Sequence, residues 1–86
     1  MRIDKFLFFV RIVKTRSLAH KLVEDRHFRI DGRVVERANT DVKIGNVLTF
    51  PLNERVRVIR VDGIPTRRGP APEAQACYSD LSPPAA

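Results

Sequence analysis

The sequence predicts an α+β fold in which two N-terminal helices pack on a small, mainly antiparallel sheet, followed by a Pro-rich tail with the pattern of one short helix. Three observations support this prediction. Apolar residues recur at helical spacing through the first 25 residues, the period changes to two around an Asp-Gly pair, and five of the six prolines lie after residue 61. The chain is therefore expected to form one small domain with a compositionally distinct end.

The first element is a helix over residues 3–13. It is predicted by one apolar stripe at i, i+3, i+4, i+7 and i+10, formed by Ile3, Phe6, Leu7, Val10 and Val13. Phe8 and Ile12 project from the opposite side of this helix, and such a second stripe needs a cover. We expect residues 64–81 to dock on it.

A second helix is predicted over residues 16–25. Thr15 and Ser17 are N-cap residue types, and a short apolar stripe follows them, formed by Leu18, Ala19, Leu22 and Val23. Arg26 occupies the position just past this helix, where a left-handed residue is common. We therefore expect a positive φ at Arg26.

The period then changes around Asp31-Gly32, a dipeptide that favours a type I′ hairpin turn. In that register Ile30 faces Arg33, and Phe28 faces Val35 on the same side.

Further strands are expected after the hairpin. Val42 and Ile44 alternate with polar residues, and residues 47–50 and 55–61 have strand composition, with Pro51 and Asn53 marking the turn between them. Residues 57–60 break the alternation, which indicates either a bulge or a segment covered on both faces.

The composition shifts near residue 62, so we expect residues 1–62 to form the domain with its strand-rich extension and residues 63–86 to form the Pro-rich tail. Within the tail Pro72 suits the first turn of a short helix. Its apolar stripe would be Ala74, Cys77, Tyr78 and Leu81.

The length of 86 residues argues against a deep catalytic cleft, so we expect no enzyme and no cofactor. His20 and His27 are the only histidines and the single cysteine, Cys77, is far from them, so no metal site is expected. The four glycines are dispersed, and no Gly-rich loop opens a helix to cradle a nucleotide. The longest wholly apolar run is residues 6–10, which favours a soluble, cytoplasmic protein.

Positive charge is concentrated in the N-terminal half. The chain has a formal net charge of +6, and residues 1–37 account for +5 of it. Lys14-Thr15-Arg16-Ser17 form the corner between the helices, with His20 and Lys21 on the next turns. Hydroxyls, a forked guanidinium and the N-terminus of a helix all suit phosphate oxygens. The alternative is that Thr15 or Ser17 only caps the helix and the basic side chains are simply solvated.

The order of helix, basic corner, helix, Asp-Gly hairpin and further strands resembles the RNA-binding domain named after ribosomal protein S4. The resemblance covers about residues 1–50, and its motifs are residues 2–7, Arg11, and residues 15–19, 28–32 and 42–48. The strand-rich continuation and residues 67–74 resemble the fifteen-kilodalton heat-shock branch of that family. The resemblance implies binding of structured RNA, ribosomal RNA in particular, without catalysis by the domain.

Carried over by position, the resemblance implies RNA contacts by Arg2, Lys5, Arg11, Thr15, Arg16, Ser17, His20, Lys21 and Arg33, to which the corner adds Lys14. It assigns core positions to Leu18, Ala19, Leu22, Phe28 and Ile30. Two departures from the family pattern are Arg26, where glycine is usual, and Asp31-Gly32 in place of Asn-Gly.

Other functions remain open at this point. A DNA-binding helix-turn-helix would need a third, recognition helix, whereas strands follow the second helix here. An adaptor could use the second apolar stripe to bind a protein. A pseudouridine synthase would need a separate catalytic partner. The expected partner is ribosomal RNA or a ribosomal subunit, with no membrane and a monomeric chain.

Overall fold

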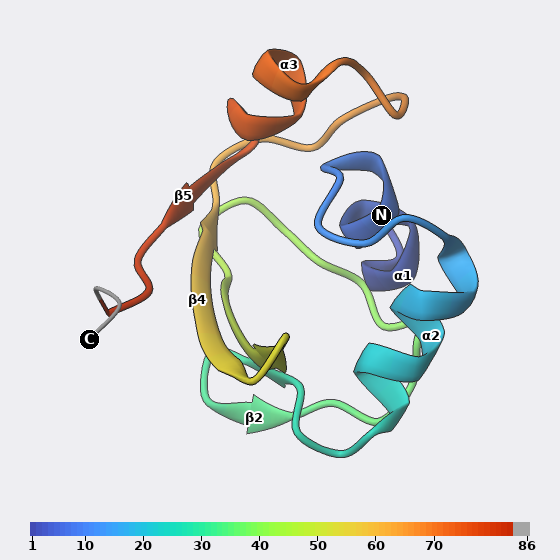
Figure 1. The fold of residues 1–86 in the computed structure, drawn as a ribbon, viewed down its shortest axis with the longest axis vertical. Helices are drawn as coiled ribbons and strands as arrows, with labels where there is room; N and C mark the ends of the chain where they lie inside the picture. The colour runs from blue at the N-terminus through green and yellow to red at the C-terminus, as the bar shows by residue number, and fades with distance from the viewer. Residues whose placement is uncertain (84–86) are drawn as a thin grey trace.

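The computed structural model describes residues 1–83, and Figure 1 shows α1 and α2 on the concave side of a curved sheet. The helices are α1 (Ile3–Phe9), α2 (Arg16–Glu24) and α3 (Ala71–Gln75). The strands are β1 (Arg29–Ile30), β2 (Arg33–Val34), β3 (Val47–Leu52), β4 (Arg55–Val61) and β5 (Tyr78–Asp80). They form a five-stranded sheet in the order β2-β1-β3-β4-β5, with antiparallel neighbours throughout. The predicted α+β class is confirmed.

The core lies between the two N-terminal helices and the sheet. Phe6 of α1, Phe28 before β1 and Phe50 of β3 are fully buried, and the rings of Phe28 and Phe50 stack with their centroids 5.2 Å apart. Burying an aromatic or aliphatic side chain of this size stabilises a fold by about 1.5–3 kcal/mol. This packing fixes the position of the helices against the sheet.

Helix α1 is shorter than predicted and ends at Phe9 instead of residue 13. Arg11 has a φ of 63°, so the chain leaves the helical path there. The turn still returns Val13 to the core beside Val10, which explains why both residues fitted the helical spacing. The pattern of apolar residues gives no indication that Arg11 has a positive φ.

The first turn of α1 is held by the segment that precedes β3. The N–H of Ile3 donates to the Thr40 carbonyl at 2.7 Å, and the N–H of Asp4 donates to the Ala38 carbonyl at 3.2 Å. These bonds satisfy donors that a helix N-terminus leaves free.

The strand expected through Val42 and Ile44 is wrong. The segment makes one isolated bridge, between Arg2 and Asp41, and the Val42 N–H donates to the Met1 carbonyl. Val42 is buried but Ile44 is 65% exposed. Pairing with the N-terminus takes the place of pairing within the sheet.

Helix α2 runs almost as predicted, from Arg16 to Glu24. Ala19 and Val23 are fully buried, but Leu18 is 45% exposed, so its assignment to the core is wrong. Leu18 instead lines a groove between α2 and the β3–β4 turn. Arg26 has a φ of 66°, which confirms the predicted left-handed residue after this helix.

The hairpin has the predicted turn and register. Asp31 and Gly32 have φ values of 51° and 82°, which suit a type I′ turn, and Ile30 pairs with Arg33. The Val35 N–H donates to the Phe28 carbonyl at 2.8 Å, as the predicted pairing requires.

The β3–β4 hairpin excludes one predicted alternative and corrects the predicted turn. Its register is continuous from the pair Val47 and Arg60 to the pair Leu52 and Arg55, so this ladder has no bulge at residues 57–60, one of the two alternatives predicted there. Pro51 lies inside β3 and the turn is formed by Asn53 and Glu54, both with positive φ. Since the β1–β3 pairing stops at Thr49, the missing N–H of Pro51 interrupts no pairing with β1.

The tail returns to the domain. Pro72 lies in the first turn of α3 as predicted, but the helix ends at Gln75, and Tyr78 begins β5 beside β4. Cys77 and Tyr78 pack against the core, whereas Leu81 is exposed, so the expected helical stripe stops early.

The expected docking of the tail on α1 is correct at one end only. The Arg68 guanidinium lies 4.7 Å from the centroid of the Phe8 ring, and Arg68 Nε donates to the Phe8 carbonyl at 3.0 Å. Arg11 Nε donates in turn to the Gly69 carbonyl. Ile12 instead lines a groove between α2 and the β3–β4 turn.

Candidate RNA interface

The basic corner forms where α1 ends and α2 begins. Thr15 is the N-cap of α2, and its hydroxyl oxygen accepts a hydrogen bond from the Leu18 N–H at 3.1 Å. The Arg16 and Ser17 N–H groups precede the first donor to a helix carbonyl, that of Ala19. The positive end of the helix dipole therefore lies at Arg16, the first residue of α2.

A buried carboxylate organises this corner. Asp4 has no exposed surface, although it carries a charge. Its carboxylate accepts hydrogen bonds from Arg2 Nε and Nη2, both at 3.1 Å, and from Arg16 Nη2 at 3.2 Å. His20 Nε2 lies 3.0 Å from the same carboxylate, and the Lys5 N–H donates to it at 2.8 Å. Three of the predicted RNA-binding side chains thus meet at one anion.

The hydrogen-bond donors around Asp4 affect its pKa. Burial opposes the charged form, but hydrogen bonds from Arg2, Arg16 and the Lys5 N–H together outweigh it, so the pKa of Asp4 lies below its ordinary value. Asp4 is thus a carboxylate at neutral pH, and charge-assisted bonds hold its partners.

The partners of Asp4 keep much of their surface in solvent. The side chains of Arg2, Arg16 and His20 are 47%, 48% and 45% exposed. Arg2 directs two of its nitrogens to Asp4, whereas Arg16 directs only Nη2. Arg16 therefore retains Nε and Nη1 for a second anion, which suits two-point binding of a phosphate.

The other predicted residues are placed unevenly. Lys14, Ser17 and Lys21, at the corner and on the following turns of α2, are exposed, as is Lys5 in the first turn of α1. The Lys5 ammonium lies 5.4 Å from the centroid of the Phe9 ring, which limits its freedom. Arg11 is exposed but tied to Gly69, as described above. Arg33 lies on β2, the edge strand, outside the corner.

Two arginines of the tail are engaged within the protein. Arg67 Nη2 lies 2.8 Å from the Glu73 carboxylate, and Arg68 is held at the C-terminal end of α1. Within the described residues, the tail therefore offers less free positive charge than its sequence indicates.

Asp4 is the residue that the sequence prediction missed. The only sequence signal is a charged residue in the first turn of a strongly apolar helix, two residues after Arg2. A charge at a position that packs against a second element is rarely left unpaired. That rule points to Asp4, but its partners on α2 become evident only in three dimensions.

No group of histidine, cysteine and carboxylate side chains in residues 1–83 could hold a metal ion. Burial, with a smaller contribution from Glu73, raises the pKa of the Cys77 thiol, as in a packed and unreactive cysteine. None of the helices within the described part of the chain is long and apolar enough to cross a membrane.

Two bacterial proteins are similar to this chain over most of its length. One is the RQC P-site tRNA stabilizing factor of Bacillus subtilis, which is 34% identical over 72% of this chain and 71% of its own length. Another is heat shock protein 15 of Escherichia coli, which is 30% identical over 95% of this chain. The present chain spans 61% of the length of that relative.

A solved structure shows the same fold. Heat shock protein 15 of Vibrio cholerae superimposes with a TM-score of 0.87 and 33% identity, covering 94% of this chain and 81% of the other. That structure is described as trimeric, so it gives no support to the expectation of a monomer. The resemblance to the heat-shock branch, predicted from the sequence, is confirmed.

The family model of the S4 domain matches residues 1–48, which contain α1, the basic corner, α2 and the first hairpin. The matched segment therefore includes Asp4 and the side chains that it holds. On this match, and on its similarity to these relatives, the chain belongs to the S4 domain family.

Proposed function

We propose that this protein binds structured RNA, ribosomal RNA in particular, through the corner between α1 and α2, and that it catalyses no reaction itself. The observation that carries this proposal is the buried Asp4, which holds Arg2, Arg16 and His20 at the start of α2. A charged group is costly to bury unless it is paired. Here its effect is to fix cationic groups on a surface that faces solvent.

The names of the relatives agree with an RNA-binding role. The Bacillus subtilis protein is named for stabilising a P-site tRNA, and the matched family model covers the same corner in this chain. A ribosome-associated role would place the protein in the cytoplasm. We assign RNA binding to residues 1–62 and treat residues 63–86 as the Pro-rich tail, of which Arg68 and Gly69 contact the end of α1 and the turn that follows it.

RNA is favoured over DNA by the shape of the basic surface. A helix-turn-helix protein inserts a recognition helix into the major groove, whereas the third helix of this fold, α3, has five residues and packs beside β5. A rigid basic corner suits phosphates and the surface of an RNA helix, which proteins read mostly by shape. An adaptor for a second protein would need no cationic cluster held by a buried anion.

The test compares an RNA stem-loop from the ribosome with a DNA duplex of equal length, using fluorescence anisotropy. We expect the wild-type protein to prefer the RNA and Arg16→Ala to weaken RNA binding by roughly tenfold, the loss expected for a charge-assisted contact. Arg67→Ala is the matched control, because Arg67 pairs with Glu73. Equal affinity for DNA and RNA, or an unchanged affinity in folded Arg16→Ala, would contradict the proposal.

A further inference from the structure

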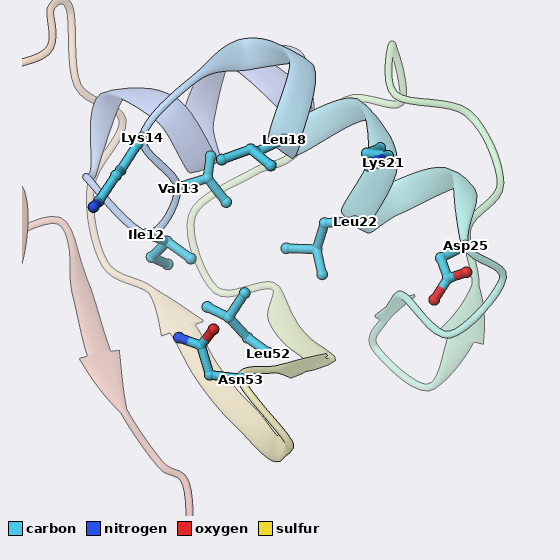
Figure 2. A pocket seen from close by; sticks show the side chains of 9 residues that line it. All are labelled: Ile12, Val13, Lys14, Leu18, Lys21, Leu22, Asp25, Leu52 and Asn53. Atoms are coloured by element: carbon cyan, nitrogen blue, oxygen red, sulfur yellow. The ribbon is translucent and has the colours of Figure 1, made fainter.

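An apolar groove adjoins the basic corner. It lies between α2 and the β3–β4 turn and has a volume of about 520 Å³. Figure 2 shows Ile12, Leu18, Leu22 and Leu52 converging on it from the turn after α1, from α2 and from β3. Leu18 is 45% exposed and does not join the core, so the apolar surface is open to solvent. A concave apolar site of this volume with a few polar groups at its edge is the usual form of a ligand site.

Polar groups also line the groove. Figure 2 shows Lys14 near Ile12, Lys21 and Asp25 further along α2, and Asn53 beside Leu52 at the β3–β4 turn. Asn53 has a φ of 52°, and the β3–β4 turn holds it in place. The groove thus combines cationic groups, an aliphatic interior and groups that can donate and accept hydrogen bonds.

We propose that this groove binds an unpaired nucleotide of the RNA, with its base between the aliphatic side chains and its phosphates near Lys14 and Lys21. This inference rests on the proposed function, because the lysines belong to the same basic surface. A base displaced from a stem exposes two apolar faces and a polar edge, which match the aliphatic walls and the Asn53 amide. The charge of the lysines complements that of the backbone phosphates.

The experiment uses two RNA hairpins of the same sequence, one with a single unpaired adenosine in its stem and one with that position paired. We expect the wild-type protein to bind the bulged hairpin roughly tenfold more tightly, because burial of one base face against aliphatic side chains contributes a factor of this order. A 2-aminopurine at the unpaired position should change its fluorescence on binding. The paired hairpin with 2-aminopurine at the same position should show little change.

Two variants test the aliphatic wall formed by Leu18 and the amide of Asn53. Leu18→Ala removes an exposed side chain that does not join the core, and Asn53→Gly removes the amide while tolerating the positive φ. Both should lose most of the preference for the bulged hairpin and retain their affinity for the paired one. Val56→Ala is the matched control, since Val56 is an exposed apolar residue outside the groove.

The outcomes separate this inference from the proposed function. Equal binding of both hairpins by the wild type, with Arg16→Ala still weakening both, would overturn the nucleotide site and leave RNA binding intact. An unchanged preference for the bulged hairpin in Leu18→Ala would also overturn it and would favour a protein segment in the groove. Failure of the wild type to bind any ribosomal stem-loop would instead contradict the proposed function.

Discussion

Asp4 shows how one buried residue links the stability of the fold to its surface. Its side chain is enclosed by α1 and α2, yet its bonds end on Arg2, Arg16 and His20, which reach solvent. Loss of the anion would leave two guanidinium groups without their common acceptor. The expected effects therefore appear both in unfolding and in RNA binding.

Replacing Asp4 with Asn should lower the free energy of unfolding at pH 7 by about 1–3 kcal/mol, the usual cost of disrupting buried hydrogen bonds to a charged group. Because the pKa of folded Asp4 is lowered, its contribution is present above the ordinary carboxyl value of 3.8 and is lost as the pH falls through the lower folded value. Urea unfolding of the wild type and of Asp4→Asn from pH 7 to pH 2 measures the free energy of unfolding of both proteins as a function of pH. Parallel curves at all pH values would show that the charge of Asp4 contributes nothing.

A double-mutant cycle tests whether Asp4 acts through Arg16. If Asp4 positions the guanidinium for phosphate, Asp4→Asn weakens RNA binding in the wild type but has little further effect in Arg16→Ala. We expect a coupling energy of about 0.5–3 kcal/mol, the range for residues in one network. The exposed Lys21, which does not bond to Asp4, provides the control cycle, and full additivity with Arg16→Ala would exclude this positioning role.

At the scale of elements, sequence prediction succeeded where signals are local. The N-cap Thr15 and the Asp31-Gly32 turn each act within a few residues, and both are confirmed. The stripe of α2 is confirmed at Ala19 and Val23, which are buried, but not at Leu18. The end of α1 depends on a left-handed Arg11, and the missing strand at Val42 depends on contacts with the N-terminus. Such tertiary causes leave no periodic pattern. The ten predicted RNA contacts stay predictions, although the structure groups most of them at the corner.

The end of α2 gives a stability prediction. Arg26 has a φ of 66°, a conformation that costs a residue with a Cβ about 1 kcal/mol, so Arg26→Gly should stabilise the protein by a comparable amount. Arg26→Ala is the control, since it removes the charge but keeps the Cβ. Thermal unfolding of the three proteins should place the alanine variant near the wild type, and an equal gain in both variants would assign the effect to charge.

The contact between the tail and α1 gives a second prediction about stability. Arg68→Ala should destabilise the protein by about 1–2 kcal/mol, because it removes a cation–π contact with Phe8 and a hydrogen bond to its carbonyl. Arg67→Ala should change stability little, since the pair with Glu73 is exposed. Chemical unfolding measures both, and equal effects would contradict a specific role of Arg68 in docking the tail.

At the scale of the whole molecule, the distribution of charge should set how RNA binding depends on salt. The chain has a net charge of +6, and Arg16, Lys5, Lys14 and Lys21 are all exposed. We expect these four side chains to contact the RNA together. If about five phosphates are neutralised, the logarithm of the association constant should fall with the logarithm of salt at a slope of roughly −3.5 to −4.5.

Variants divide that slope among residues. Arg16→Ala should reduce its magnitude by about one, because one phosphate contact is lost, while the protein stays folded. Arg33→Ala should change the slope less, since Arg33 lies on the edge strand β2, away from the corner. Titrations from low to moderate salt measure each slope, with circular dichroism to confirm folding. The salt slope counts the phosphates that each residue neutralises. If Arg33→Ala reduced the slope and Arg16→Ala left it unchanged, the RNA-binding site would have to be assigned to the β1–β2 hairpin and not to the corner.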